Sequence, residues 1–318
     1  MDKVIDKVTI LGINGRIGSH AARAFVAAGW DVTGFGRSNR HPIEGVRFAA
    51  GNSDSVEDMR AAIGEARVVV NALNPLYDQW DGGRMEALHA RVLEAMGTDG
   101  KTMLFVGNIY NYGPQQRRVT PDLTQDGTSG KARIRQRSER LLQDAAQRGD
   151  VQVIILRAGD FYGPDSAGTW FDLAILREGG KGRMALMGRP GVGHAWAYLP
   201  DLGRAFEKLA WHRSELGAFE NFHFAGNFVT PERLAAAIQR AAPTPLKVSY
   251  FPRWILSLMG LVNPIMREVA KMGYLWDHPM ELVDARLAAI LGEGFATPFE
   301  QAVSITVAGL LSKPAQAA

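Results

Sequence analysis

Three glycines near the start of the chain restrict its fold more than any other feature. Gly12, Gly15 and Gly18 follow an apolar run that ends at Leu11, and they lead into a segment with apolar residues at helical spacing, Arg16 to Ala28. A strand, a tight glycine turn and a helix in this order bring main-chain N–H groups and the positive end of a helix dipole to the turn. The stretch therefore predicts a phosphate site, and at the start of an alternating β/α chain it predicts a dinucleotide-binding fold.

The rest of the first half alternates between strand and helix patterns. The first strand takes in Val4 and Ile5, and further strands are predicted at 31–36, 46–50, 67–73, 102–106 and 151–156, with helices at 55–63, 84–96 and 138–147. Because such alternation is typical of a parallel sheet with helices on both faces, we expect a Rossmann-type, doubly wound α/β sheet. Residues 1–165 form the predicted dinucleotide-binding domain.

The pattern loosens beyond residue 165. Residues 166–318 are predicted to form a smaller, mostly helical C-terminal substrate lobe, with helices at 170–177, 201–211 and 231–241 and a glycine-rich loop at 179–193. Segments 194–200 and 221–225 are expected to return to the main sheet as short strands. The tail from Phe251 is apolar and aromatic, which indicates core packing.

Composition excludes several classes of function. The 318 residues include no cysteine, which rules out disulfides, thiolate catalysis and cysteine–zinc sites, and no metal site is predicted. The net charge of +3 gives no reason to expect a nucleic-acid partner. The N-terminus has no apolar signal region, and no apolar run approaches the roughly 20 residues of a membrane span. We expect a cytoplasmic protein with a small-molecule substrate and no membrane partner, and a homodimer stays open.

The end of the second predicted strand discriminates between nicotinamide dinucleotides. An acidic residue at this place accepts the ribose hydroxyls of NAD, whereas this chain has Arg37 and Ser38. A guanidinium group and a hydroxyl suit a 2′-phosphate, so we expect NADP rather than NAD. The residues expected at the cofactor lie at carboxyl ends of strands: Gly12, Asn14, Gly15, Arg16, Ile17, Gly18, Arg37, Ser38, Asn52, Asn71, Ala72 and Leu73.

The order of these motifs resembles the extended short-chain dehydrogenase/reductase superfamily, the NAD-dependent epimerase/dehydratase group, over nearly the whole chain. The glycine turn matches its GxxGxxG opening, and Gly107 to Gly113 matches in length its SSxxVYG-type segment. Arg157 to Pro164 looks like its R-x-x-N-x-YGP segment, and Leu199-Pro200-Asp201 looks like its V-x-D segment. The resemblance implies the same fold and pyridine-dinucleotide chemistry.

The catalytic set departs from the family. The resemblance implies Ser or Thr after the fifth strand and Tyr-x-x-x-Lys on the next helix, where the tyrosine transfers a proton and the lysine holds the cofactor ribose. Asn108 occupies the serine position, and alignment on Glu139 places Lys131 at the tyrosine and Arg135 at the lysine. No tyrosine lies between Gly113 and Asp160, so no shift of register restores the motif.

Three interpretations follow. In the first, the chain is an NADP-dependent oxidoreductase or epimerase/dehydratase-like enzyme for a small carbonyl or hydroxyl substrate. Arg135 then contacts the ribose, Asn108 donates to the substrate, and Tyr110, Tyr112 or a desolvated Lys131 transfers the proton. In the second, it is a catalytically silent NAD(P)-binding sensor or regulatory protein. In the third, the basic helix 131–140 binds an anionic partner, but a solvated basic face is the commoner explanation. We favour the first by analogy with the superfamily.

The substrate is only loosely specified. The residues expected at it are Asn74, Tyr77, Tyr112, Phe161, His194 and Trp196. Their aromatic character favours a partly apolar ketone or aldehyde as much as a nucleotide sugar. His89, beside the apolar stripe of the helix at 84–96, is interpreted as structural.

Overall fold

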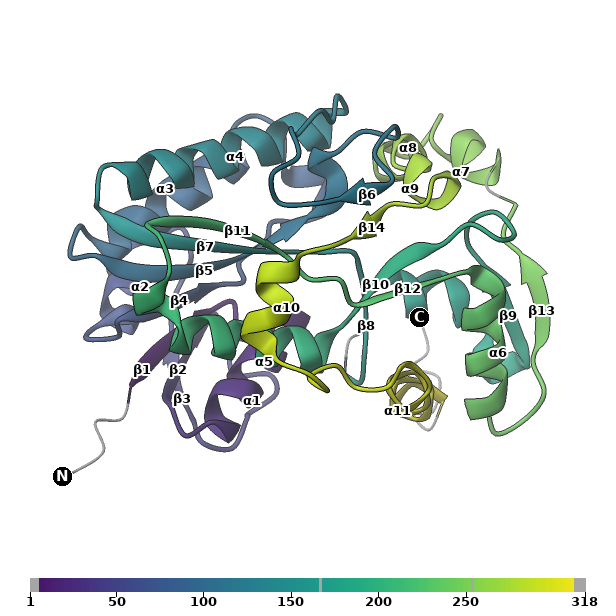
Figure 1. Cartoon of the computed structure of the whole chain (residues 1–318), viewed down its shortest axis with the longest axis horizontal. Coiled ribbons are helices and arrows are strands. Elements are labelled where there is room, and N and C mark those ends of the chain that lie inside the picture. Colours follow the sequence, from purple (N-terminus) through teal and green to yellow (C-terminus); the bar gives the residue numbers. More distant parts are fainter. Residues whose placement is uncertain (1–5, 166–167, 253, 312–318) are drawn as a thin grey trace.

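The structure, a computed structural model, describes residues 6–165, 168–252 and 254–311. Val4 and Ile5, which we assigned to the first strand, lie outside the described residues. Figure 1 shows a layered α/β body on the left and a second body of short strands and helices on the right.

Seven parallel strands form the main sheet, in the order β11–β7–β5–β4–β1–β2–β3. Their order reverses between β1 and β4, the arrangement that opens a ligand crevice at the carboxyl ends of such sheets. This confirms the doubly wound, Rossmann-type α/β fold. The strands are β1 Lys7–Leu11, β2 Asp31–Gly36, β3 Val46–Ala50, β4 Val68–Asn71, β5 Lys101–Asn108, β7 Val151–Ala158 and β11 Phe219–His223.

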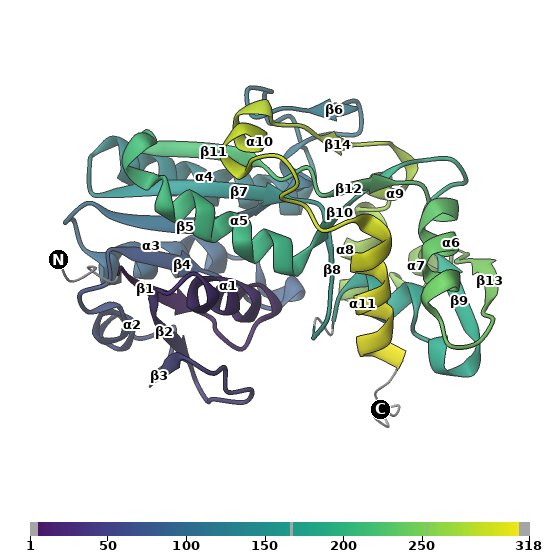
Figure 2. The same cartoon turned by 60° about the horizontal axis from the view of Figure 1, so that its bottom comes forward.

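Helices cover both faces of this sheet (Figures 1 and 2). One face carries α2 Val56–Ile63, α3 Arg84–Met96 and α4 Gly130–Gln147, and the other carries α1 Arg16–Ala27 and α5 Leu199–Trp211. Helices α1 and α5 pack closely, because a Cβ at Gly203 would lie 2.5 Å from the carbonyl oxygen of His20. The two apolar layers fix the sheet, so the strand ends form a rigid edge for a site.

The second body has its own apolar core, which includes Tyr162, Phe171 and Trp196. Its strands are β8 Asp160–Tyr162, β10 His194–Tyr198 and β12 Asn227–Val229 in one sheet, and the pairs β9 Arg183–Leu186 with β13 Lys247–Tyr250 and β6 Arg118–Val119 with β14 Glu281–Leu282. Its helices are α6 Pro231–Ala241, α7 Trp254–Met259, α8 Pro264–Lys271, α9 Tyr274–Asp277 and α11 Phe299–Leu311, while α10 Ala285–Leu291 reaches back to α5. No helix of the described chain is both long and apolar enough to cross a membrane.

Several elements differ from the sequence prediction. The segment 194–200 supplies β10 to the three-stranded sheet rather than to the main sheet, whereas 221–225 overlaps β11 of the main sheet. Helix α4 contains both predicted helical stretches, 131–140 and 138–147, and the Ser129 hydroxyl caps it by accepting from the Ala132 N–H at 3.0 Å. The helix predicted over 170–177 is a short π-helical turn, and the loop 179–193 contains β9.

His89 is a buried structural residue, as its place on α3 suggested. Its ring is completely buried with its edge toward Phe105, and within the described chain neither ring nitrogen has a hydrogen-bond partner. Burial, and to a lesser extent the charge of Arg135, lowers the pKa of His89 to about 3. The ring is therefore neutral at physiological pH.

This histidine makes stability depend on pH. Below its ordinary pKa of 6.5 the unfolded chain protonates His89, whereas the folded chain does so only near pH 3, so the free energy of unfolding falls as pH decreases between these values. The loss amounts to up to about 1.4 kcal/mol per pH unit. We expect His89→Leu to lose less unfolding free energy than the parent chain between pH 7 and pH 5, measured by urea denaturation. The exposed His41→Gln serves as control, and equal losses in His89→Leu and the parent would contradict this assignment.

Candidate cofactor and active site

The turn between β1 and α1 leaves no room for side chains at two of its glycines. Gly12 has a φ of +88°, and a Cβ there would lie 3.0 Å from the carbonyl group of Ala72. A Cβ at Gly18 would lie 2.3 Å from the carbonyl oxygen of Gly12. Gly15 is exposed and has an ordinary φ of −77°. The turn itself thus requires Gly12 and Gly18, whereas Gly15 leaves the main chain bare toward solvent.

The first turn of α1 points main-chain donors at this opening. The first N–H groups of a helix have no intrahelical acceptors. The N-cap Gly15 has no side chain to accept from them. Bare donors and the positive helix end suit a phosphate group.

The loops around the turn are tied to one another. Asn14 donates from Nδ2 to the Ser38 carbonyl oxygen at 2.6 Å and accepts at Oδ1 from the Arg40 N–H at 3.3 Å. Arg37 is exposed, and its side chain has no hydrogen-bond or ion-pair partner among the described residues. Asn52 is also exposed, but its Oδ1 accepts from the Asp54 N–H and so orders its own loop.

The end of β4 packs against the glycine turn between β1 and α1. The Ala72 N–H donates to the Leu11 carbonyl oxygen at 3.0 Å. Asn71 is buried, and its Oδ1 accepts from the Leu73 N–H at 3.3 Å. Its Nδ2 has no partner in the part of the chain that the structure describes. This amide is a buried donor next to the turn.

Arg16 connects the turn to the second body. Its guanidinium donates to the Gly168 carbonyl oxygen at 2.8 Å, and burial lowers its pKa while the charge of Asp172 opposes that shift. His20, one helical turn further on, places Nε2 2.9 Å from the Pro164 carbonyl oxygen. Ile17 packs against the core on the same face of the sheet. The segment after β8 therefore borders the turn.

Two cations of α4 lie inside the protein beside the end of β4. Lys131 is 1% exposed, donates from Nζ to the Tyr77 carbonyl oxygen at 2.7 Å, and lies 3.6 Å from the Asp81 carboxylate. Arg135 donates to Asn74 Oδ1 at 3.1 Å, and its guanidinium carbon lies 4.3 Å from the centre of a Trp80 ring. The loop after β4 thus covers both cations.

The basic helix 131–140 is therefore not a uniform solvated face, which corrects our expectation. Arg133, Arg137 and Arg140 are exposed, but Lys131 and Arg135 face inward. Burial lowers the pKa of Arg135 to about 10, and its Nε has no partner among the described residues. A buried donor without an acceptor is costly unless a ligand or water satisfies it.

Tyr110 holds its proton. It lies near Trp80, with ring centres 6.4 Å apart. Burial, with contributions from Tyr77 and Asp160, raises the pKa of Tyr110 well above its usual 10, and Arg135 opposes this only in part. The Tyr110 N–H donates to Asn108 Oδ1 at 3.0 Å, which fixes the amide at the end of β5. At neutral pH Tyr110 is therefore protonated.

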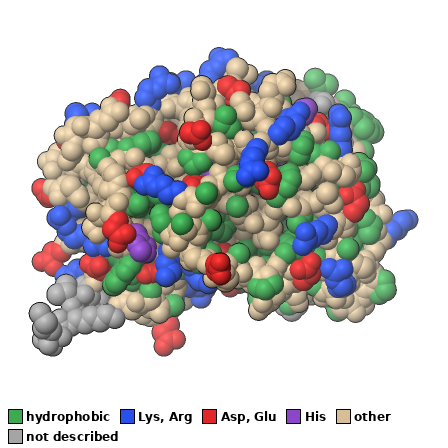
Figure 3. Space-filling model, viewed as in Figure 1, with side chains coloured by type: hydrophobic (Ala, Val, Ile, Leu, Met, Phe, Trp, Pro, Cys, Tyr) green, Lys and Arg blue, Asp and Glu red, His purple; other side chains and the backbone are tan. Residues whose placement is uncertain are grey.

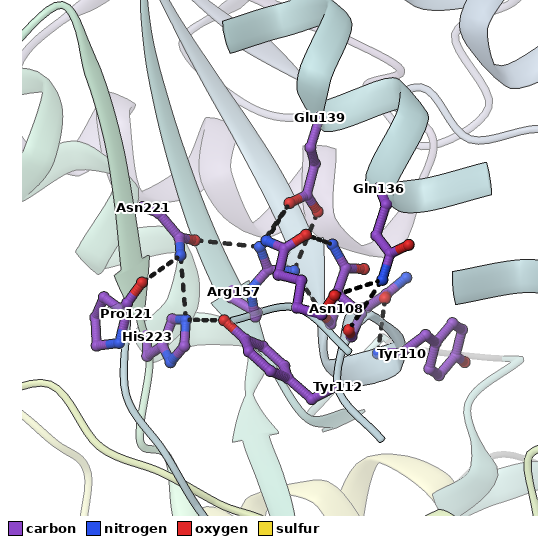
Figure 4. Close-up of polar contacts among 11 residues, drawn as sticks. Asn108, Tyr110, Tyr112, Pro121, Gln136, Glu139, Arg157, Asn221 and His223 are labelled. Atoms are coloured by element: carbon purple, nitrogen blue, oxygen red, sulfur yellow. Dashed lines mark hydrogen bonds and ion pairs between the residues drawn. The ribbon is translucent and has the colours of Figure 1, made fainter. Parts of the chain in front are cut away.

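A buried ion pair lies directly behind Asn108 (Figure 4). Arg157 of β7 is completely buried and donates twice to the Glu139 carboxylate, at 2.7 and 3.1 Å. It also donates to the Asn108 carbonyl oxygen at 2.6 Å and to Asn221 Oδ1 at 3.2 Å. Burial alone would lower the pKa of Arg157, but Glu139 raises it above its ordinary value. Arg157 thus fixes the main chain on which Asn108 stands.

Tyr112 belongs to the interior rather than to a substrate surface or a proton-transfer site. It is completely buried, and its hydroxyl lies 3.1 Å from His223 Nε2 (Figure 4). Burial lowers the pKa of His223 to about 4, so the ring is neutral. Its Nδ1 donates to the Val119 carbonyl oxygen at 3.0 Å, which leaves Nε2 to accept from Tyr112.

His194 and Trp196 are also buried, in the core of the second body. His194 places Nε2 2.8 Å from the Asp160 carboxylate and Nδ1 3.0 Å from the Leu275 carbonyl oxygen. Its ring stacks on Trp276, with ring centres 3.9 Å apart. Trp196 is 2% exposed, which corrects its assignment as a substrate contact. Phe161 is half-buried against the core shared with α1 and α5.

The structure thus brings the glycine turn, the end of β4 and Arg16 together, and it places Asn74, Tyr77, Tyr110, Lys131 and Arg135 in a second group. Sequence reasoning missed Trp80 and Asp160, and it used Glu139 only as an alignment marker. A charged Arg157 closing the apolar run of β7 was a signal, because a buried charge needs a partner.

We expect Glu139→Gln to reduce the free energy of unfolding by about 3–5 kcal/mol, because it leaves the buried Arg157 charge without its counter-charge. Breaking the exposed pair of Arg47 with Asp31 by Arg47→Met should cost less than about 1 kcal/mol. Urea denaturation measures both. A Glu139→Gln loss no larger than that of the control would show that the pair does not hold this region together.

Comparison with known proteins identifies the family. Residues 8–222 match the NAD dependent epimerase/dehydratase family, and a search of curated proteins finds no match. Among solved structures, the chain is similar to UDP-glucuronic acid 4-epimerase from Bacillus cereus in complex with UDP-glucuronic acid and NAD (13% identity, TM-score 0.75, 96% of this chain and 99% of that chain). It is also similar to UDP-glucose 4-epimerase from Brucella ovis in complex with NAD (16%, TM-score 0.72, 96% and 98%). The enzyme WbmH of Bordetella bronchiseptica in complex with NAD+ gives comparable values (19%, TM-score 0.72, 96% and 98%). At these identities the solved structures show only the fold. The family match spans most of the sequence, and the chain therefore belongs to the NAD-dependent epimerase/dehydratase family.

Proposed function

We propose that this protein is a nicotinamide-dinucleotide-dependent enzyme of the extended short-chain dehydrogenase/reductase type that acts on a small carbonyl or hydroxyl substrate. The proposal rests on the main-chain N–H groups at the start of α1, which the N-cap Gly15 leaves without a side-chain acceptor. They lie where the strand order of the sheet reverses, between β1 and β4. Family membership and the NAD in related structures support the cofactor class.

The residues present fit such a cofactor. The first turn of α1 would hold the pyrophosphate, and Asn71 Nδ2 and Arg135 Nε are buried donors without partners among the described residues. Arg135 would contact the ribose in place of the family lysine. When bound, the nicotinamide ring supplies or accepts a hydride at the reacting carbon of the substrate.

Residues of this chain would supply the proton that the substrate oxygen receives. Tyr110 retains its proton, which suits donation to the oxygen of a carbonyl that is being reduced. The amide of Asn108 would polarise that oxygen, and the charges of Lys131 and Arg135 would stabilise negative charge as it develops there.

The preference between NADP and NAD depends on the end of β2. Arg37 is exposed and without a partner in the described chain, and the nearby Arg40 N–H is bonded to Asn14. The positively charged side chains of Arg37 and Arg40 and the absence of an acidic residue at 37 or 38 favour NADP. The related structures named above contain NAD.

We expect Arg37→Asp to weaken NADPH binding about tenfold or more and to leave NADH binding unchanged or tighter, because one charge-assisted contact to the 2′-phosphate is lost. Calorimetric titration of the full chain with each cofactor measures this. Arg47→Met, on the neighbouring strand β3, is the control. If the parent chain binds NADH more tightly than NADPH, the NADP preference is wrong, but the assignment of a nicotinamide dinucleotide site stands.

Turnover tests the proton donor. With NADPH or NADH and a panel of aldehydes and ketones, we expect Tyr110→Phe to lower kcat by about 10²–10⁴, the usual range for general acid catalysis, with cofactor affinity retained. Tyr250→Phe, at an exposed site of the second body, should have no effect. If the Tyr110→Phe enzyme keeps the parental kcat, Tyr110 is not the proton donor. Lys131 is then the remaining candidate, and Lys131→Met tests it.

A silent cofactor-binding sensor is the second candidate. It is favoured by the hydrogen bonds that already engage Lys131 with the Tyr77 carbonyl and Arg135 with Asn74. Tight dinucleotide binding without turnover of any carbonyl compound would select it. Failure to bind either dinucleotide would refute both candidates.

A further inference from the structure

A pocket of about 230 Å³ lies in the second body, between the helices α7, α8 and α9 and the turn that follows β8. Three tryptophans line it: Trp170, Trp254 and Trp276. Trp170 and Trp276 stand nearly perpendicular, with ring centres 6.4 Å apart, and so form an aromatic corner. Flat faces and edges in this arrangement pack well against another ring.

The lining carries almost no charge. Asp277 is the ionisable residue among the described lining residues, and it is paired with Arg189 at 2.7 Å. The remaining lining is aromatic or aliphatic, as at Leu256 and Val269. A diphosphate needs cationic or main-chain donors, and here it would meet a carboxylate instead. The charges therefore favour a neutral group.

The pocket adjoins the candidate active site through contacts on two sides. Trp276 stacks on His194, and His194 is bonded to Asp160. Tyr110 packs against the same apolar core as Trp170, Val269 and Trp276. On the other side, Trp170 follows shortly after Gly168, whose carbonyl oxygen accepts from Arg16 of the glycine turn. The pocket and Tyr110 thus border one apolar core.

The surface around the pocket is apolar as well. Trp254 of α7 is 68% exposed, and Leu258, Leu261 and Val262 next to it are 57%, 74% and 88% exposed. Figure 3 shows hydrophobic side chains gathered over this corner of the molecule, at its upper right. Exposed apolar side chains gathered in this way occur at ligand-binding grooves and at protein or membrane contacts.

We propose that this pocket binds the flat, apolar ring of a neutral carbonyl compound, so that the substrate is an aromatic or similarly apolar ketone or aldehyde and not a nucleotide sugar. The inference rests on the proposed function for the reaction itself. The binding of the ring, however, depends only on the pocket.

Direct binding tests it without turnover. The full chain is titrated calorimetrically with 2-acetylnaphthalene, UDP-glucose and UDP-glucuronic acid, each with and without NADPH. We expect 2-acetylnaphthalene to bind at least about tenfold more tightly than either nucleotide sugar. Trp254→Ala should weaken that binding about tenfold, and Ala270→Phe, which fills the pocket, should weaken it further. Trp211→Ala, which removes an exposed tryptophan of α5, should change nothing.

The outcomes separate this inference from the proposed function. If either nucleotide sugar binds as tightly as 2-acetylnaphthalene, or if Trp254→Ala and Ala270→Phe both leave the binding of 2-acetylnaphthalene unchanged, the substrate class is wrong while the cofactor assignment stands. If 2-acetylnaphthalene binds as expected but no nicotinamide dinucleotide does, the pocket stands and the enzyme proposal fails. Thermal unfolding of each variant establishes that Ala270→Phe is folded, and Trp254→Ala carries the test if it is not.

Discussion

The buried pair of Arg157 and Glu139 determines how the candidate active site faces the sheet. Taking both charges out of water is costly, and the bidentate geometry offsets that cost only if α4 keeps one rotation about its axis. Lys131, Arg135 and Glu139 are spaced four residues apart, so they share one face of α4. When Glu139 turns inward to meet Arg157, the two cations must turn inward as well. The same guanidinium holds the Asn108 carbonyl and thereby joins α4 to the end of β5.

The fold followed from local patterns because its determinants are local. The glycine turn, the β-branched run of β4 and the apolar stripe of α3 each have a period that neighbouring residues reveal. Positions 12 and 18 must be glycine because a Cβ there would collide with Ala72 and with Gly12. Such constraints can be recognised from the spacing of glycines in the sequence. Short elements were harder to predict, since the helix expected over 170–177 is only a π-helical turn at Phe171–Ile175.

The site was harder to predict because its partners are distant in sequence. The sequence left open whether Lys131 is desolvated or part of a solvated basic face. The carbonyl of Tyr77 and the ring of Trp80, both from the loop after β4, show that it is buried. Tyr112 and His194 stand in or near family motifs, which suggested contact with substrate. Their hydrogen bonds to His223 and Asp160 instead satisfy polar atoms that the core encloses.

The surroundings of Tyr110 keep its hydroxyl protonated, although this residue does not stand at the position of the family tyrosine. A tyrosine beside a lysine acts as acid and base because the cation lowers its pKa. Here Arg135 exerts that influence on Tyr110, but burial and the carboxylate of Asp160 outweigh it. The charge of Arg135 therefore does not bring the pKa of Tyr110 into the range of a family tyrosine beside its lysine. A protonated phenol on one side and positive charge on the other are the features on which the proposed carbonyl chemistry rests, and the pocket at Trp276 is the basis for proposing an apolar substrate.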